Sequence, residues 1–198
     1  MPRIIYIKES KGGSYVILGI ADGEDKKAFA VAKATYSSLG SPSRFHEFSD
    51  EEISVIEAAN DEYRALKKAL SLLSYADNSE KNLTMKLRRS GFSKDTAEGA
   101  VREVVRLGYL KEDEQLRRLI VYEANSRLTG PLKIASKLMA KGYSSSAIRD
   151  IVDTLRDEGE VDFSENCRRL LEKKLPDDAT DEEKYKLLKS YGYKTYDC

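Results

Sequence analysis

Lysine recurs at every fourth position over one stretch of the chain, at Lys133, Lys137 and Lys141. Residues four apart lie on the same face of a helix, so these amines would form a cationic strip about two turns long. Arg102 and Arg106 repeat this spacing on an earlier segment. Such rows can bind phosphate groups or acidic protein surfaces, although a solvated helix surface explains them equally well.

The charges of the chain cancel overall, but they are unevenly distributed. Residues 79–143 hold 14 Lys and Arg against 8 Asp and Glu, whereas residues 50–78 hold 3 against 7 and residues 144–198 hold 10 against 14. This basic middle favours either a solvated surface or a docking face for an acidic partner or a phosphate backbone. The candidate partner-binding residues are Lys86, Arg88, Arg89, Arg102, Arg106, Arg117, Arg118, Lys133, Lys137 and Lys141.

No constellation of residues in the sequence indicates catalysis. The stretch "KGGS" lacks the G-x-x-x-x-G-K-[ST] spacing of a phosphate-binding loop and fits a tight turn better. His46, the single histidine, has no nucleophile or metal partner that the sequence identifies. The acidic pairs Asp177–Asp178 and Glu182–Glu183 fit a solvated loop and a helix start better than a metal site. We therefore expect a protein that is not an enzyme and that needs no cofactor or metal.

The hydropathy of the chain predicts a cytoplasmic protein. No apolar run approaches the roughly 20 residues that cross a bilayer, and "MPRIIYIKES" is too short and too quickly polar for a signal peptide. We expect no membrane partner and a monomeric state. Cys167 and Cys198 are expected to be reduced thiols, as is usual in the cytoplasm.

The elements that must position the basic residues begin with strands. The runs "RIIYIKE", "YVILGI" and "KAFAVA" are rich in β-branched and aromatic residues, and "SKGGS" and "ADGED" supply the turn residues between them. This pattern predicts a small antiparallel sheet of about three strands. A short helix closed by Gly40 and an extended connector are expected to follow.

From Ser49 onward the apolar residues recur with a period of about 3.6, which indicates helices. Ser49 and Glu52 have the spacing of a capping box. Residues 50–75 fit one long helix or two shorter ones. Ser79 is expected to cap the helix that follows.

One sequence pattern occurs twice, in "LRRSGFSKDTAEGAVREVVRLGYL" and in "LMAKGYSSSAIRDIVDTLRDEGEV", at an offset of 51 residues. The offset superposes Gly91 on Gly142 and Ser93 on Ser144. Each glycine is expected to end a helix in a left-handed conformation, and each serine to cap the next helix. A third copy begins at "LLKSYGYK" and stops early.

These patterns predict a mainly α fold, with tandem three-helix repeats in an elongated, curved array preceded by a small antiparallel β segment. Three-helix units of this size bury little apolar surface singly, so neighbouring units must stack. The expected divisions are a β-rich segment at 1–48, an entry helix and repeat one at 49–110, repeat two at 111–161, and repeat three at 162–198, truncated before its last helix.

With the repeats laid out, the sequence resembles the RecX family of regulators of the RecA recombinase. The stretches that carry the resemblance are "LSLLSYADNSEKNLTMKLRRSGFS", "AVREVVRLGYLKEDE" and "LTGPLKIASKLMAKGYS". It covers about residues 63–175. Lys111 departs from the pattern, because the family usually has Asp directly after Gly-Tyr-Leu.

The resemblance implies a largely helical array that binds along the groove of the RecA–DNA filament. It implies inhibition of the recombinase, ATPase and coprotease activities, in DNA repair and the SOS response, with little dependence on DNA sequence. The expected partner is therefore the RecA filament, with contacts to the DNA backbone as a further possibility. An alternative is direct DNA binding by helix-turn-helix-like repeats, but Asp95 and Glu98 at the start of that helix would repel phosphate.

Overall fold

The computed structural model describes residues 1–194, and the second cysteine, Cys198, lies outside that range. The described chain is mostly helical, with one small sheet. It divides into two units, the first made of residues 1–75 and 84–109, the second of residues 76–83 and the chain from Leu110 onward. Helix α3 (Glu80–Arg89) therefore begins in the second unit and ends in the first.

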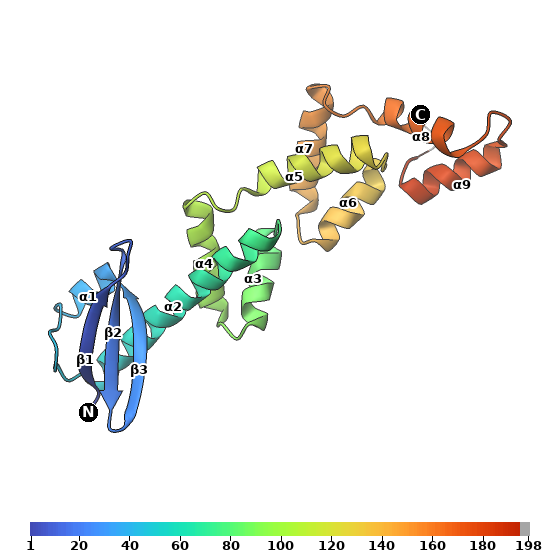
Figure 1. The fold of residues 1–198 in the computed structure, drawn as a ribbon. Coiled ribbons are helices and arrows are strands. Elements are labelled where there is room, and N and C mark those ends of the chain that lie inside the picture. Colours follow the sequence, from blue (N-terminus) through green and yellow to red (C-terminus); the bar gives the residue numbers. More distant parts are fainter. Residues whose placement is uncertain (195–198) are drawn as a thin grey trace. The chain divides into compact units, whose positions relative to one another are not determined.

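The first unit begins with strands β1 (Arg3–Glu9), β2 (Tyr15–Asp22) and β3 (Asp25–Ala32) (Figure 1). They form an antiparallel sheet in the order β1-β2-β3, which confirms the predicted β segment. Helix α1 (Lys33–Ser38) follows, and Gly40 just after it has a φ of 80°, as expected for a residue that ends a helix.

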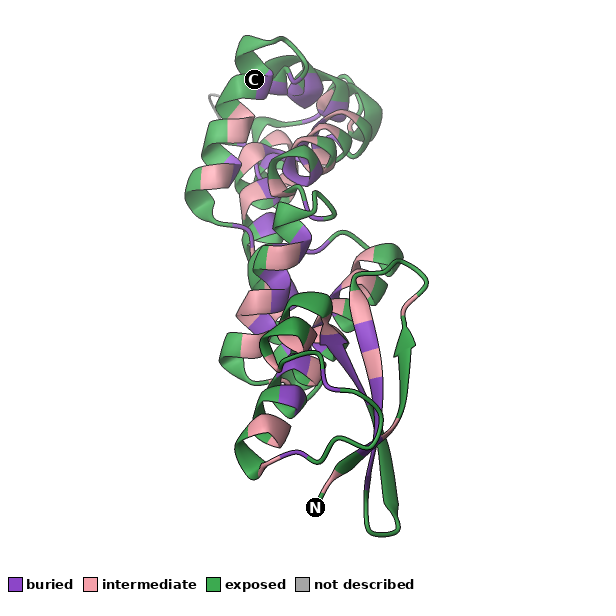
Figure 2. Ribbon diagram, turned by 90° about the vertical axis from the view of Figure 1, so that its left-hand side faces the viewer, coloured by how far each residue is buried: buried purple, intermediate pink, exposed green. Residues whose placement is uncertain are grey.

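One face of this sheet is covered by helix α2 (Asp50–Tyr75), a single helix of 26 residues (Figure 1). Its predicted capping box is present: the Ser49 N–H donates to Glu52 Oε2 at 2.9 Å, and the Glu52 N–H donates to the Ser49 hydroxyl at 3.2 Å. The buried residues of α2 change sides along the helix (Figure 2): Ile56 and Ala59 lie on one side of its first half, and Ala65 and Ala69 lie on roughly the opposite side of its second half. Among them, Ile56 and Ala59 pack against the apolar side chains of the sheet.

Helix α4 (Lys94–Arg106) completes the first unit and packs against α2. Its apolar stripe is buried, with Ala97, Val101 and Val104 between 0 and 3% exposed. Because this stripe faces inward, the basic side chains of α4 lie on the solvent side of the helix.

The second unit contains α5 (Glu112–Val121), α6 (Pro131–Ala140), α7 (Ser145–Asp157), α8 (Phe163–Lys174) and α9 (Asp181–Tyr191). Helix α5 ends at Val121, and the chain continues as a π-helical turn, η1 (Tyr122–Ser126). The wider turn is closed by a hydrogen bond of 3.2 Å from the Arg127 N–H to the Tyr122 carbonyl, five residues earlier.

The repeated glycines have matching backbone conformations. Gly91 and Gly142 have φ values of 95° and 93°, and Gly108 and Gly159 have values of 74° and 72°. The two predicted serine caps are also present and accept hydrogen bonds from the expected backbone N–H groups. The repetition in the sequence is therefore a repetition in structure.

The core of the second unit is one apolar cluster to which all of its helices contribute. Tyr143 and Tyr193, which occupy equivalent positions in two repeats, are each only 4% exposed and belong to this cluster. Cys167 is also buried there and is not a free thiol. The expectation of a reduced thiol at this position is therefore wrong.

Candidate partner-binding surfaces

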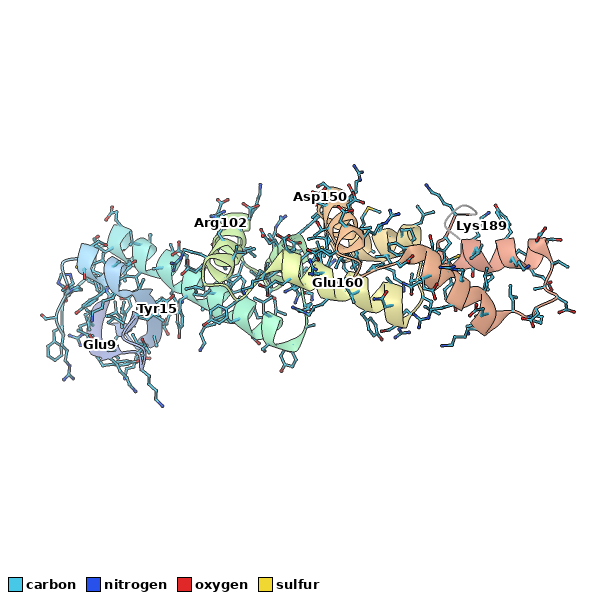
Figure 3. All side chains as sticks on the ribbon, turned by 90° about the horizontal axis from the view of Figure 1, so that it is seen from above. Glu9, Tyr15, Arg102, Asp150, Glu160 and Lys189 are labelled. Carbon is cyan, nitrogen blue, oxygen red and sulfur yellow. The ribbon has the colours of Figure 1, made fainter. Side chains whose placement is uncertain are left out.

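Three of the candidate arginines of the first unit have no carboxylate partner among the residues that the structure describes. Arg88 and Arg89 are exposed in the last turn of α3. Arg102 is exposed on α4 and extends away from the ribbon (Figure 3). Lys86, one turn before these α3 arginines, is only half exposed and takes part in a further interaction. The three arginines are therefore free to meet a partner.

Arg106 lies on the same face of α4 as Arg102, but it has a partner within the helix. Its Nε and Nη2 atoms each donate to a carboxylate oxygen of Glu103, at 2.7 Å. These hydrogen bonds lower the pKa of the Glu103 carboxyl below its usual value. The same spacing thus produces one paired and one unpaired guanidinium.

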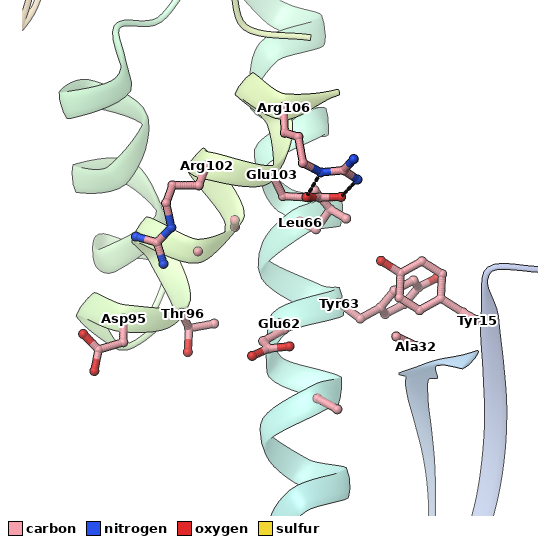
Figure 4. Close-up of a pocket in the computed structure, with 13 residues that line it drawn as sticks. Tyr15, Ala32, Glu62, Tyr63, Leu66, Asp95, Thr96, Arg102, Glu103 and Arg106 are labelled. Carbon is pink, nitrogen blue, oxygen red and sulfur yellow. Dashed lines mark hydrogen bonds and ion pairs between the residues drawn. The ribbon is translucent and has the colours of Figure 1, made fainter. Parts of the chain in front are cut away.

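A pocket of about 600 Å³ lies beside these arginines, between α2, α4 and the end of the sheet (Figure 4). Its charged lining residues are Glu62, Asp95, Arg102, Glu103 and Arg106. Tyr15 and Tyr63 form another part of the lining, with ring centroids 4.6 Å apart. Burial, and then the charge of Glu103, raise the pKa of the Tyr15 hydroxyl. The mixture of carboxylates and guanidiniums does not make an anion site.

The two candidate arginines of α5 bind carboxylates of other elements. Arg117 forms ion pairs with Glu158 and, at 2.7 Å, with Glu160, both just after α7. Arg118 donates to both carboxylate oxygens of Asp77 at 3.2 Å. These contacts indicate that Arg117 and Arg118 stabilise the second unit.

The lysine row of α6 is only partly available. The Lys133 amine donates to the carbonyl of Ser190 at 2.7 Å, and the Lys137 amine donates to Glu123 at 2.6 Å. Lys141 is exposed and has no ion pair within the described chain. The predicted strip of three amines is therefore a single unpaired amine beside two that other helices engage.

Two hydrogen bonds that join consecutive repeats occupy equivalent positions. The Ser79 hydroxyl, at the start of α3, donates to the Lys141 carbonyl at 2.8 Å. The Gly130 N–H, at the start of α6, donates to the Tyr191 carbonyl at 2.8 Å. The donors are 51 residues apart and the acceptors 50. A side-chain hydroxyl therefore donates the hydrogen bond between one pair of repeats, and a backbone N–H donates it between the next pair. The sequence predicted only the capping role of Ser79.

Two residues after Lys141, the acceptor of the Ser79 hydroxyl, Tyr143 makes a buried polar contact. The Tyr143 hydroxyl donates to Gln115 Oε1 at 3.0 Å. Burial, together with the charges of Asp77 and Glu112, raises the pKa of Tyr143 to about 12. A phenol held neutral in this way is a packing residue.

Within residues 1–194 no three His, Cys, Asp or Glu side chains are grouped so that they could hold a metal ion. None of the helices in that range is long and apolar enough to cross a membrane.

Comparison with known proteins identifies the family. Residues 65–103, which hold the unpaired arginines, match the family described as "RecX, first three-helix domain". The regulatory protein RecX of Ectopseudomonas mendocina (strain ymp) is 31% identical over 117 residues, which make up 57% of this chain and 75% of that protein. The chain belongs to the RecX family. The RecX protein of Lactobacillus johnsonii is also 31% identical, over 112 residues and 57% of this chain, but the match covers only 41% of that protein.

The solved structures agree with this assignment at the level of the fold. A crystal structure of a regulatory protein RecX covers 100% of this chain, and the chain covers 97% of it, with a TM-score of 0.74 and 18% sequence identity. The three-helix domains of the RecX family are therefore also the building units of this protein. These relatives are named regulatory proteins.

Proposed function

We propose that this protein binds the RecA–DNA filament and inhibits or modulates recombination, ATPase and coprotease activity, and that it acts by binding and not by catalysis. Membership of the RecX family is the observation that carries this proposal. The protein would act as a wedge across neighbouring protomers, blocking access to the groove and disfavouring filament growth. It would do so in the cytoplasm, as a monomer.

The arginines without carboxylate partners are the side chains best suited to such a role. Arg88, Arg89 and Arg102 lie within the matched three-helix domain, and each is exposed. An unpaired guanidinium can form bidentate bonds with a carboxylate or a phosphate, whereas Arg106 and Arg117 would first have to leave their own carboxylates. We therefore assign partner contact first to the unpaired arginines.

The test is an assay of recombinase ATPase and strand exchange with the cognate recombinase. Wild-type protein is expected to inhibit both reactions. The variant Arg102→Glu should weaken inhibition, and the matched variant Arg106→Glu, one turn away on the same helix, should weaken it less. Absence of any effect of the wild-type protein at saturation would refute the function. Equal effects of the two variants would refute only the assignment to Arg102.

Direct DNA binding by the helical repeats is the second candidate. The exposed cations at the end of α3 favour it, but Asp95, in the first turn of α4, opposes it. Tight, steeply salt-dependent binding to naked duplex DNA that is lost in Arg88→Glu would support this alternative.

A further inference from the structure

The sheet of the first unit has one face packed against α2, and a second face that borders α2 beside β3, where Ile17, Ala28 and Ala30 line a pocket with residues of α2 (Figure 1). Residues directly opposite each other in an antiparallel sheet point to the same face. The strand register therefore defines the second face, here called the outer face. Its three rows across the sheet are Arg3–Ala21–Lys26, Tyr6–Gly19–Ala28 and Lys8–Ile17–Ala30.

A β-bulge creates this set of neighbours. In a regular strand, Arg3 and Tyr6 would point to opposite faces, because they are three residues apart. The register of β1 shifts between Ile4 and Tyr6. The extra residue, Ile5, brings Arg3 and Tyr6 to the same face.

The charged residues within the three rows of the outer face are cationic. They are Arg3, Lys8 and Lys26, all exposed, and none of them forms an ion pair with another described residue. Within β1–β3 the three rows contain no carboxylate, but an isolated antiparallel bridge places Glu47 opposite Arg3, at the end of the first row. Two acidic residues of the β2–β3 hairpin, Asp22 and Asp25, are directly opposite each other in the strand register and point to the other face. Three unpaired cations therefore surround the middle row, and they complement an anionic partner.

The middle row carries an exposed aromatic ring. A side chain on Gly19 would lie 2.1 Å from Cε1 of Tyr6, so the ring occupies the space above this glycine. Tyr6 nevertheless remains 44% exposed. Ala28, opposite Gly19 on β3, has a small side chain that projects little from the sheet beside the Tyr6 ring. The rows with the cations lie about 7 Å to either side of it, the spacing of alternate residues along a strand.

We propose that the outer face binds single-stranded nucleic acid, with a base stacked against Tyr6 and phosphates bound by Lys8, Lys26 and Arg3. Single strands are bound in this way, by cations that follow the backbone and aromatic rings on which bases stack. An acidic protein segment would complement the charges, but it would leave the exposed ring without a function. The proposal does not depend on binding of the recombinase.

The test measures the fluorescence anisotropy of a labelled oligothymidylate with the full-length protein at low salt. Wild-type protein should bind, and the logarithm of its association constant should fall with the logarithm of salt with a slope of about −2, the value for three phosphate contacts. Lys26→Glu should weaken binding about tenfold, since it replaces an attraction by a repulsion. The matched control is Lys27→Glu, which makes the same charge change on the opposite face of the same strand, and it should change affinity by less than about twofold.

Two variants isolate the ring. Tyr6→Leu still covers Gly19 but has no aromatic ring, and it should weaken binding about tenfold, the typical effect of losing one stacked base. Tyr6→Phe should bind like the wild type. Circular dichroism should show that all four variants are folded.

Four results would overturn the proposal: no binding by folded wild-type protein, equal weakening by Lys26→Glu and Lys27→Glu, unchanged binding by Tyr6→Leu, or tighter binding of polyglutamate than of the oligonucleotide. The last result would assign the outer face to an acidic protein. Recombinase inhibition plays no part in these readouts, so the function proposed above can fail or hold independently.

Discussion

The hydroxyl of Ser79 donates a 2.8 Å hydrogen bond to the carbonyl of Lys141, which lies 62 residues further along the chain. The same hydroxyl accepts a hydrogen bond of 3.2 Å from the N–H of Asn82 and so caps α3. One oxygen atom therefore both starts a helix and joins two repeats.

Ser79→Ala should remove both contacts and leave the Lys141 carbonyl without its donor. We expect a loss of about 2 kcal/mol in the free energy of unfolding, the sum of a helix cap and a buried hydrogen bond. Ser144→Ala is the control, because Ser144 caps α7 through Ala147 without an inter-repeat bond, and it should lose about 1 kcal/mol. Urea unfolding monitored by circular dichroism measures both, and equal losses would contradict the double role of Ser79.

Alanine at three equivalent glycines should have graded effects. A side chain on Gly91 meets nothing within 4 Å, one on Gly142 comes within 2.6 Å of the Ser79 Oγ, and one on Gly192 comes within 2.5 Å of the Lys133 backbone nitrogen. All three have positive φ, which disfavours alanine by about 1–2 kcal/mol.

Gly91→Ala should show little beyond this backbone effect. Gly142→Ala should lose more, and Gly192→Ala most, more than about 3 kcal/mol, because backbone atoms cannot move aside as a side chain can. Thermal unfolding of the three variants gives the order. The same loss at all three positions would mean that the joints between repeats contribute little.

Stability should fall at high pH because of Tyr143, whose pKa is raised to about 12. A group with a raised pKa contributes stability below its unfolded value, about 10 for tyrosine, and that contribution is lost as pH rises toward the folded value. Tyr143→Phe should remove the decline specific to this residue between about pH 10 and 12. Unfolding midpoints measured across this range, compared with the exposed control Tyr75→Phe, would show it. A decline that persists unchanged in Tyr143→Phe would exclude Tyr143 as its source.

Alanine variants of Arg117 and Arg102 should distinguish a residue that stabilises the fold from one that binds the partner. Arg117→Ala breaks ion pairs with Glu158 and Glu160 and should lower the melting temperature of the second unit. Arg102→Ala breaks no ion pair of the described chain and should leave melting unchanged while weakening recombinase inhibition. Differential scanning calorimetry and an ATPase assay provide the two readouts. Reversed effects would exchange the roles assigned to these arginines.

The sequence alone predicted the features that depend on short separations. The capping box of Ser49 and Glu52, the serine caps of the repeats and the left-handed glycines were all expected, and all are present. Their contacts lie within a few residues of each other, so local spacing is sufficient to identify them. The sequence does not decide whether residues 50–75 form one helix or two, because a long helix and two short ones share one apolar period.

Which basic residues are unpaired was decided only by the tertiary structure. Arg117 and Arg118 stand side by side in the sequence, yet each binds carboxylates about 40 residues away, at Glu158 and Asp77. A charged side chain acquires such a partner only when distant elements pack together, and no periodicity reports that.

The neighbours of Tyr6 also depend on the tertiary structure, because one additional residue in β1 changes which side chains share the outer face. The sequence determined the repeats, since identical local rules act on each copy. Folding in three dimensions decided the surfaces, since a surface is assembled from residues that the chain keeps far apart.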